Sequence, residues 1–202
     1  RQIFEPGFHL STASQAAAWE ALAASGRDEK PEGDLQVILN AALEGTNERL
    51  RVQALGLISR WRVAELQDAT ATLAFTDGTA QATRLAAVRT LGALGADETK
   101  RLAKLIGSDA PAGLRIAGLE SLARSDLPEA AALGAGMIGN GQAVDEVLQT
   151  FLNREAGGDA LTKALAKARI GKATAATALA RLQSIGSSEA RLMEYLGKLA
   201  GV

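Results

Sequence analysis

Residues 102–123 read LAKLIGSDAPAGLRIAGLESLA, and this stretch decides the fold. Leucine and isoleucine recur at helical spacing on both sides of a short segment that contains Asp109 and Pro111. Aspartate favours turns and proline suits the first turn of a helix, so the stretch predicts two helices joined by a tight connection.

The apolar pattern of this stretch returns along the chain about every 31 residues. One register consists of Ala54-Leu55-Ile58, Ala87-Val88-Leu91, Gly118-Leu119-Leu122, Val147-Leu148-Phe151 and Ala178-Leu179-Leu182. A second register lies ahead of the first and consists of Leu35/Leu39, Ala69/Leu73, Leu102/Ile106, Leu133/Met137, Leu161/Leu165 and Leu192/Leu196. Self-similarity with this period indicates a stack of similar units, each made of two helices.

The two registers predict an all-α fold in one domain over residues 1–202, with about five helix pairs and a half-repeat at each end. The expected parts are an irregular lead-in at 1–10, a half-repeat at 11–25, repeats at 34–60, 64–95, 97–124, 127–153 and 159–185, and a terminal helix at 188–200. In the last repeat, helix 159–170 is expected to pair with helix 173–185. The residues expected to cap helix N-termini are Asp34, Asp97, Asp126 and Asp159.

The stretch at 102–123 also resembles the HEAT repeat, an armadillo-type α-solenoid family. The resemblance rests on Asp109 at the turn, Leu114-Arg115 early in the second helix, and the small and apolar residues from Ile116 to Leu122. It implies a right-handed α-α superhelix in which an arginine of each second helix pairs with a carboxylate of the preceding turn. The resemblance covers nearly the whole chain, but it carries little information on function.

Three arginines hold this place in successive copies: Arg51, Arg84 and Arg115. We expect them to bind turn carboxylates, with Glu44 and Asp77 as the partners of the first two; a ligand-facing role is the alternative. Val144 and Ala175 replace the arginine in the last two copies. The ladder of charged pairs is therefore expected to break in the C-terminal third.

Composition limits the classes of function. Of the 202 residues 47% are apolar and only 3% aromatic, and the formal net charge is −1, which gives no global electrostatic argument for a nucleic-acid or membrane partner. The chain has no cysteine and one histidine, His9, so it offers little for a metal site or nucleophilic catalysis. Its longest uncharged run, residues 130–144, is shorter than the roughly 20 apolar residues of a membrane span. We expect a soluble chain without a cofactor; the compartment stays open, and an extracytoplasmic one would fit a secreted parent protein.

One motif could be mistaken for a nucleotide-binding loop. Residues 134–139 read GAGMIG and match G-x-G-x-x-G, a pattern that binds dinucleotides when it follows a strand and opens a helix. Here it falls inside the register of a first helix. We therefore expect a close helix crossing or a helix end.

The sharpest candidate for a partner-binding site is Arg60-Trp61-Arg62, an aromatic residue between two cations at a corner between repeats. Such a composition is typical of interface anchors. The alternative is that Trp61 fills space between repeats, because tryptophan is usually well buried.

A candidate anion-binding patch lies between Asp159 and Glu189, where basic residues occur and acidic ones do not. Its members are Lys163, Lys167, Arg169, Lys172 and Arg181. The patch has no interleaved aromatic residues, so a solvated surface is the alternative.

Stacked helix pairs present long surfaces without a deep pocket, which suits extended partners better than small substrates. We therefore expect a non-catalytic protein-interaction or scaffold module whose partner is another protein or an adjacent domain of a larger bacterial multidomain polypeptide. The alternatives come from HEAT-like enzymes, namely alkylpurine DNA glycosylases and bilin lyases, and from nucleic-acid binding through the basic patch.

Overall fold

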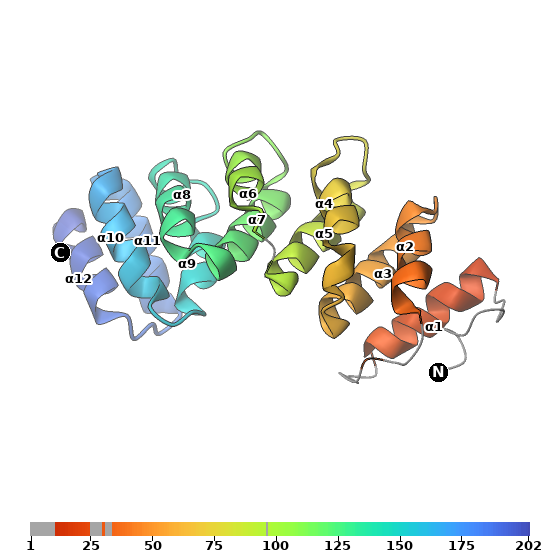
Figure 1. Cartoon of the computed structure of the whole chain (residues 1–202). Coiled ribbons are helices and arrows are strands. Elements are labelled where there is room, and N and C mark those ends of the chain that lie inside the picture. The colour runs from red at the N-terminus through yellow and green to blue at the C-terminus, as the bar shows by residue number, and fades with distance from the viewer. Residues whose placement is uncertain (1–10, 25–29, 31–33, 96) are drawn as a thin grey trace. The chain divides into compact units, whose positions relative to one another are not determined.

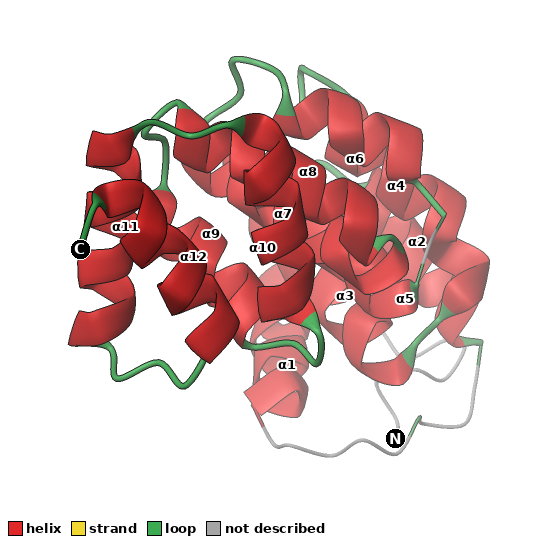
Figure 2. Ribbon diagram, turned by 90° about the vertical axis from the view of Figure 1, so that its left-hand side faces the viewer, coloured by secondary structure: helices red, strands yellow, loops and turns green. Residues whose placement is uncertain are grey.

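The computed structural model describes residues 11–24, 30, 34–95 and 97–202 (Figure 1). Of these residues 78% are helical and none lies in a strand, as Figure 2 shows, which confirms the all-α prediction. The expected lead-in at 1–10, with His9, lies outside the described residues. No helix in the described ranges is long and apolar enough to cross a membrane.

Contacts divide the chain into two compact units, residues 1–96 and 97–202, and the single array over 1–202 stays a prediction. The first unit contains α1 (Thr12–Ala24), α2 (Leu35–Glu44), α3 (Glu48–Trp61), the 3₁₀ turn η2 (Ala64–Leu66), α4 (Gln67–Phe75) and α5 (Gln81–Leu94). The second contains α6 (Thr99–Ile106), α7 (Ala112–Ser125), α8 (Leu127–Gly139), α9 (Val144–Leu152), α10 (Gly157–Ala168), α11 (Lys172–Ser184) and α12 (Ala190–Ala200).

In the first unit, each helix packs against its neighbour in the chain or the helix after that neighbour. Helix α3 packs against α1, α2 and α5, while α4 packs against α2 and α5. Consecutive helices α2 and α3, and likewise α4 and α5, therefore form two helix pairs.

The second unit follows the same scheme. Helices α6, α8, α10 and α12 lie side by side in this order (Figure 1), and α7, α9 and α11 pack behind them. Helix α6 pairs with α7, whereas α8 packs more extensively on α10 and α7 than on α9, its expected partner. Helix α11 packs most extensively against α12, so the expected pairing of 159–170 with 173–185 is not the main contact of this region.

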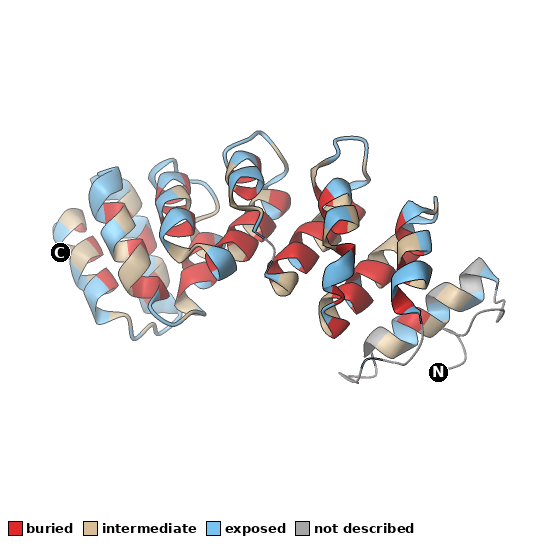
Figure 3. Ribbon diagram, viewed as in Figure 1, coloured by how far each residue is buried: buried red, intermediate tan, exposed pale blue. Residues whose placement is uncertain are grey.

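The core lies between the helices of each unit (Figure 3). All residues of the first apolar register are buried, from Ala54 to Leu182. The second register has exceptions, since Ala69, Leu73 and Leu133 are only half-buried. In α4 the buried positions are instead Thr70, Ala71 and Ala74. The 3₁₀ turn η2, with about three residues per turn, directly precedes α4, so the expected helix 64–75 does not have one uniform helical period.

Two of the four expected caps are confirmed. Asp34 accepts a hydrogen bond from the Val37 N–H at 3.3 Å, and Asp126 accepts one from the Glu129 N–H at 3.0 Å. The other two expectations are wrong. The Asp97 carboxylate accepts a hydrogen bond from the Thr99 hydroxyl, and Asp159 is already inside α10, because that helix begins two residues earlier than expected.

Candidate functional site

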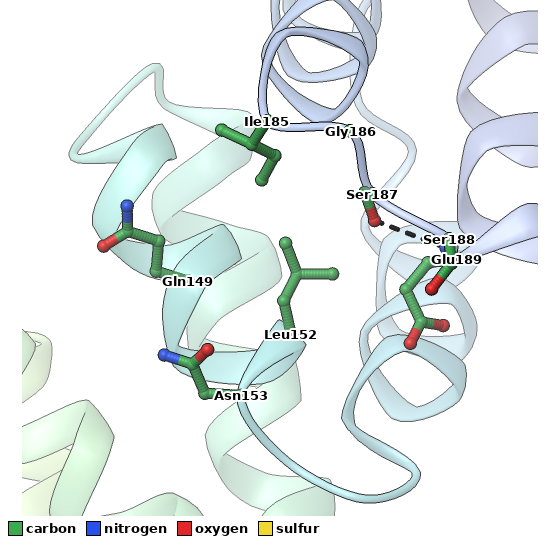
Figure 4. Close-up of a pocket in the computed structure, with 8 residues that line it drawn as sticks. All are labelled: Gln149, Leu152, Asn153, Ile185, Gly186, Ser187, Ser188 and Glu189. Atoms are coloured by element: carbon green, nitrogen blue, oxygen red, sulfur yellow. Dashed lines mark hydrogen bonds between the residues drawn. The ribbon is translucent and has the colours of Figure 1, made fainter.

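A hollow of about 490 Å³ opens in the second unit, between the end of α9 and the connection from α11 to α12 (Figure 4). Its lining residues are Gln149, Leu152, Asn153, Ile185, Gly186, Ser187, Ser188 and Glu189. No motif in the sequence indicates this site. The two lining segments are distant in sequence, and only folding brings them together.

The connection is held in one conformation by its own hydrogen bonds. Gly186 has a φ of 63°, a left-handed conformation that favours glycine, and the Ser187 N–H donates back to the Leu182 carbonyl at 3.0 Å. The Ser187 hydroxyl then accepts a hydrogen bond from the Glu189 N–H at 3.3 Å, shown dashed in Figure 4. This wall of the hollow is therefore preformed.

The hollow combines apolar and polar groups. Leu152 and Ile185 point toward each other across it (Figure 4), and Ile185 is 42% exposed, unusual for so large an apolar side chain. Gln149 and Asn153 lie four residues apart, on one face of α9 and at its end. An amide both donates and accepts hydrogen bonds, so this wall can bind the main chain or polar side chains of a polypeptide.

Glu189 gives the hollow one negative charge, although its carboxylate is partly used within the fold. It lies directly over Gly158, where a side chain would overlap it, at the start of α10. A carboxylate is favourable beside a helix N-terminus because the first N–H groups there are unpaired. The Glu189 carboxylate therefore lies close to the start of α10.

The corner Arg60-Trp61-Arg62 ends α3 in the first unit. Arg62 adopts a left-handed conformation with a φ of 49°, and its N–H donates to the Ile58 carbonyl. Trp61 is only 7% exposed, whereas Arg62 is exposed and Arg60 half-buried. This burial favours the space-filling role for Trp61. A partner contact at the corner stays a prediction and would be made by the two arginines.

Two of the three arginines of the expected ladder bind main-chain carbonyls. Arg51 Nε donates to the Leu43 carbonyl at 3.0 Å and Arg84 Nε donates to the Ala74 carbonyl at 3.3 Å; each acceptor is the second-last residue of the preceding helix. The expected charged pairing holds for Arg84, whose Nη1 lies 3.6 Å from Asp77 Oδ1.

The other two charged pairs differ from the expectation. Glu44, the expected partner of Arg51, instead accepts a hydrogen bond from Asn40 at 2.8 Å. Arg115 donates to Gln142 Oε1 at 3.1 Å, and in the described part of the chain no ion pair joins it to Asp109.

The five residues of the expected basic patch have different surroundings. Arg181 forms an ion pair with Asp145 of α9 at 3.0 Å, Arg169 ends α10 in a left-handed conformation, and Lys172 begins α11. Only Lys163 and Lys167 line one common groove, between α8 and α10. An acidic residue distant in sequence thus neutralises part of the patch.

Two further arginines, neither of them at a position of the expected ladder, join successive parts of the second unit. Arg154 Nη2 donates to the Glu120 carbonyl of α7 at 3.0 Å, and Arg191 of α12 pairs with Asp159 of α10 at 3.2 Å. Burial and then the nearby Arg124 guanidinium lower the pKa of Arg154, while Glu120 opposes this shift. Their spacing of 34 and 32 residues from their partners, close to the repeat length, is the signal that could have found them.

The glycine motif at 134–139 lies inside α8. A Cβ at position 134 would come within 2.8 Å of the Phe151 ring and 3.1 Å of Val147, both on α9. Gly134 therefore permits a close helix crossing, one of the two expected roles. Across the described residues, no three His, Cys, Asp or Glu side chains gather as a metal site would need.

Comparisons with protein families, with curated proteins and with solved structures find no match to this chain.

Proposed function

We propose that the chain is a non-catalytic protein-interaction or scaffold module, built as a stack of HEAT-like helix pairs. One observation carries the proposal: in both units, each helix packs against a chain neighbour, against a helix two positions along, or against both. This scheme is what a stack of helix pairs produces, because each pair buries its apolar faces against the pairs before and after it.

Polar contacts at the repeat length support the stack. The Arg154 and Glu120 contact spans 34 residues and the Arg191 and Asp159 contact spans 32. In the first unit the buried Thr90 hydroxyl donates to the Leu55 carbonyl, 35 residues earlier. The Thr90 contact joins α5 to α3, the Arg191 contact joins α12 to α10, and Arg154, which follows α9, reaches α7.

The stack can be tested by small-angle scattering. The relation for compact domains gives a radius of gyration of about 16.5 Å for a chain of this length. A stack of pairs through both units requires a clearly larger value. A scattering curve that fits the compact value would contradict the solenoid.

The hollow of Figure 4 supports an interaction role over small-molecule chemistry. It presents amides, hydroxyls and the apolar side chains Leu152 and Ile185 on a preformed surface, a mixture that suits contact with a polypeptide. The partner is either another protein or an adjacent domain of the same polypeptide.

A site-specific photo-crosslink tests this role. A benzophenone side chain at Gln149, inside the hollow, is compared in the source cells with one at Lys100, an exposed position on α6. We expect one discrete adduct from position 149 only, competed by excess unlabelled chain but not by an Ile185→Asp variant. Equal adducts from both positions, or none from position 149, would contradict a specific interaction at this hollow.

A further inference from the structure

A second hollow, of about 320 Å³, forms a groove between α8 and α10 in the second unit. Its lining residues are Leu127, Pro128, Ala132, Ala156, Asp159, Ala160, Lys163, Ala164 and Lys167. Six of these nine side chains are Ala, Leu or Pro, so the walls are largely apolar.

Small side chains make the groove accessible to a further helix. Ala132 on α8 is exposed, and Ala160 and Ala164 on α10 are half-buried and lie four residues apart. The distance between packed helix axes depends on the side chains at the contact, and alanine allows the closest approach of any residue with a Cβ. A third helix could therefore pack against α8 and α10 together.

Charge decides which helix would fit. Lys163 and Lys167 are both exposed, one turn apart on the same face of α10. In the part of the chain that the structure describes, neither lysine pairs with a carboxylate. The one acidic lining residue, Asp159, is already neutralised by Arg191 of α12 at 3.2 Å. The edge of the groove is therefore positively charged.

We propose that this groove docks an acidic amphipathic helix of a partner protein. Its apolar stripe would cover the alanines, and two carboxylates four residues apart would face Lys163 and Lys167. Both helices rise about 6 Å in four residues, so the two charge pairs can form at once when the helices lie side by side. The proposal rests on the interaction role above, and it names a partner chemistry for a different surface.

The groove favours a protein helix over a nucleic acid. None of its lining residues is aromatic, so bases would have no surface on which to stack. Two lysines also neutralise only two phosphates, which makes a weak and salt-sensitive site. A helix with an apolar stripe uses the alanine surface as well as the charges.

Peptide selection tests the proposal. Random peptides of about 16 residues, enough for about 24 Å of helix, are selected on the full chain and counter-selected on the K163E/K167E variant. We expect the enriched peptides to carry an apolar helical stripe and acidic residues four positions apart. Fluorescence anisotropy then measures the affinity of the best peptide for each variant.

The variants have matched controls within the chain. K163E/K167E should weaken binding by about tenfold or more, because two attractive pairs become repulsive. K100E/K104E reverses an exposed lysine pair with the same spacing on α6 and should leave binding unchanged. Ala132→Trp fills the groove and should abolish binding, whereas Ala176→Trp, at an exposed position on α11, should not.

Several results would contradict the proposal that this groove docks an acidic helix. If polyglutamate competes for the chain as well as the selected peptide does, the surface is charged but has no specific groove. Unchanged peptide binding by Ala132→Trp would lead to the same conclusion. A single-stranded oligonucleotide that displaces the peptide at equal concentration would favour nucleic acid. Peptides that bind wild type and K163E/K167E equally would refute this groove but leave the interaction role standing, while a selection that enriches no peptide would count against both.

Discussion

In the first unit, an arginine hydrogen bond joins the two helices of each pair, whereas a glycine allows close packing of α8 against α9. Arg51 and Arg84 reach back across their pairs to a carbonyl near the end of the preceding helix. In α8, Gly134 lets the Phe151 ring of α9 come so close that even a methyl group would clash. The same problem, how to hold two consecutive helices together, is solved once by a charged hydrogen bond and once by shape.

The pair of α6 with α7 lies between these extremes. Arg115 occupies the arginine position, but the Ser108 hydroxyl already donates to the equivalent carbonyl, that of Leu105, at 2.8 Å. Arg115 instead reaches forward to Gln142. A Cβ at Gly118 would come within 3.3 Å of Ile106 and 3.4 Å of Leu105 across the pair. A position in the repeat therefore does not fix the partner of its side chain, because a neighbour can take that partner first.

The largest expected effect comes from filling the glycine contact. Gly134→Ala should destabilise the second unit by about 1–3 kcal/mol, because its Cβ would overlap Phe151 in a packed core. Gly136→Ala is the matched control in the same helix, with open space around its Cβ, and should stabilise by about 1 kcal/mol. Urea denaturation measures both; equal effects would show that Gly134 plays no part in the crossing.

The contrast between these pairs also shows how far a sequence can predict such a molecule. The bounds of α8 match the expected 127–139, because an aspartate cap, a proline in the first turn and glycine at the end all act within the helix itself. The start of α10 was misplaced because Ala156 takes a left-handed conformation with a φ of 57°, which an alanine does not signal. Helix ends that follow from local residue preferences could be predicted from the sequence, whereas the left-handed conformation of Ala156 could not.

The candidate site was less predictable for a related reason. Gln149 and Ile185 line one hollow only because α9 packs against α11. Arg51 and Arg84 donate to main-chain carbonyls, and every residue has a carbonyl, so the sequence does not indicate which one is the acceptor. By contrast, the pairing of Arg84 with Asp77 was expected because both residues belong to the same repeat. Membership of one repeat is not sufficient for such a prediction, because Glu44 and Arg51 also share a repeat and do not pair.

Removal of an arginine should lower stability more in the first unit than in the pair of α6 with α7. Arg84→Met leaves the part-buried Ala74 carbonyl without its charged donor and should lower stability by about 1–2 kcal/mol. Arg115→Met should change stability by less than about 0.5 kcal/mol, because Arg115 Nε is buried without a partner and the Gln142 contact is exposed. Denaturation midpoints with unchanged slopes test this, and equal losses would contradict the distinction.

The first unit joins α5 to α3 through a hydroxyl and α3 to α1 through the ion pair of Arg49 with Glu20, whereas the second unit uses Arg154 and Arg191. Thr90→Val removes the hydrogen bond from α5 to the Leu55 carbonyl of α3 and should cost about 1 kcal/mol. Thr83→Val is the control in the same helix, since the Thr83 hydroxyl is buried without a partner, and it should be neutral or stabilising. A thermal melt that ranks the two variants in the reverse order would refute this reading.

The turn from α9 to α10 carries strain that glycine should relieve. A left-handed alanine costs about 1–2 kcal/mol, and glycine gives back part of this through the entropy of the unfolded chain, so Ala156→Gly should stabilise by about 0.5–1 kcal/mol. Ala176→Gly, exposed inside α11, should instead destabilise by about 1 kcal/mol. Urea denaturation measures both variants. If their free energies of unfolding change in the same direction, the prediction of strain at Ala156 is wrong.

The smallest effect tests why Arg115 departs from Arg51 and Arg84. If Ser108 excludes the arginine from the Leu105 carbonyl, Ser108→Ala frees that carbonyl and Arg115 Nε should take it, as in the two earlier pairs. The new bond offsets the lost hydroxyl, so stability should fall by less than about 0.5 kcal/mol alone but by about 1 kcal/mol when Arg115→Met is also present. A double-mutant cycle measures this coupling, and a crystal structure of Ser108→Ala shows the guanidinium directly. Strictly additive effects, with Arg115 still on Gln142, would mean that the geometry of the third pair, and not competition from Ser108, directs the arginine forward.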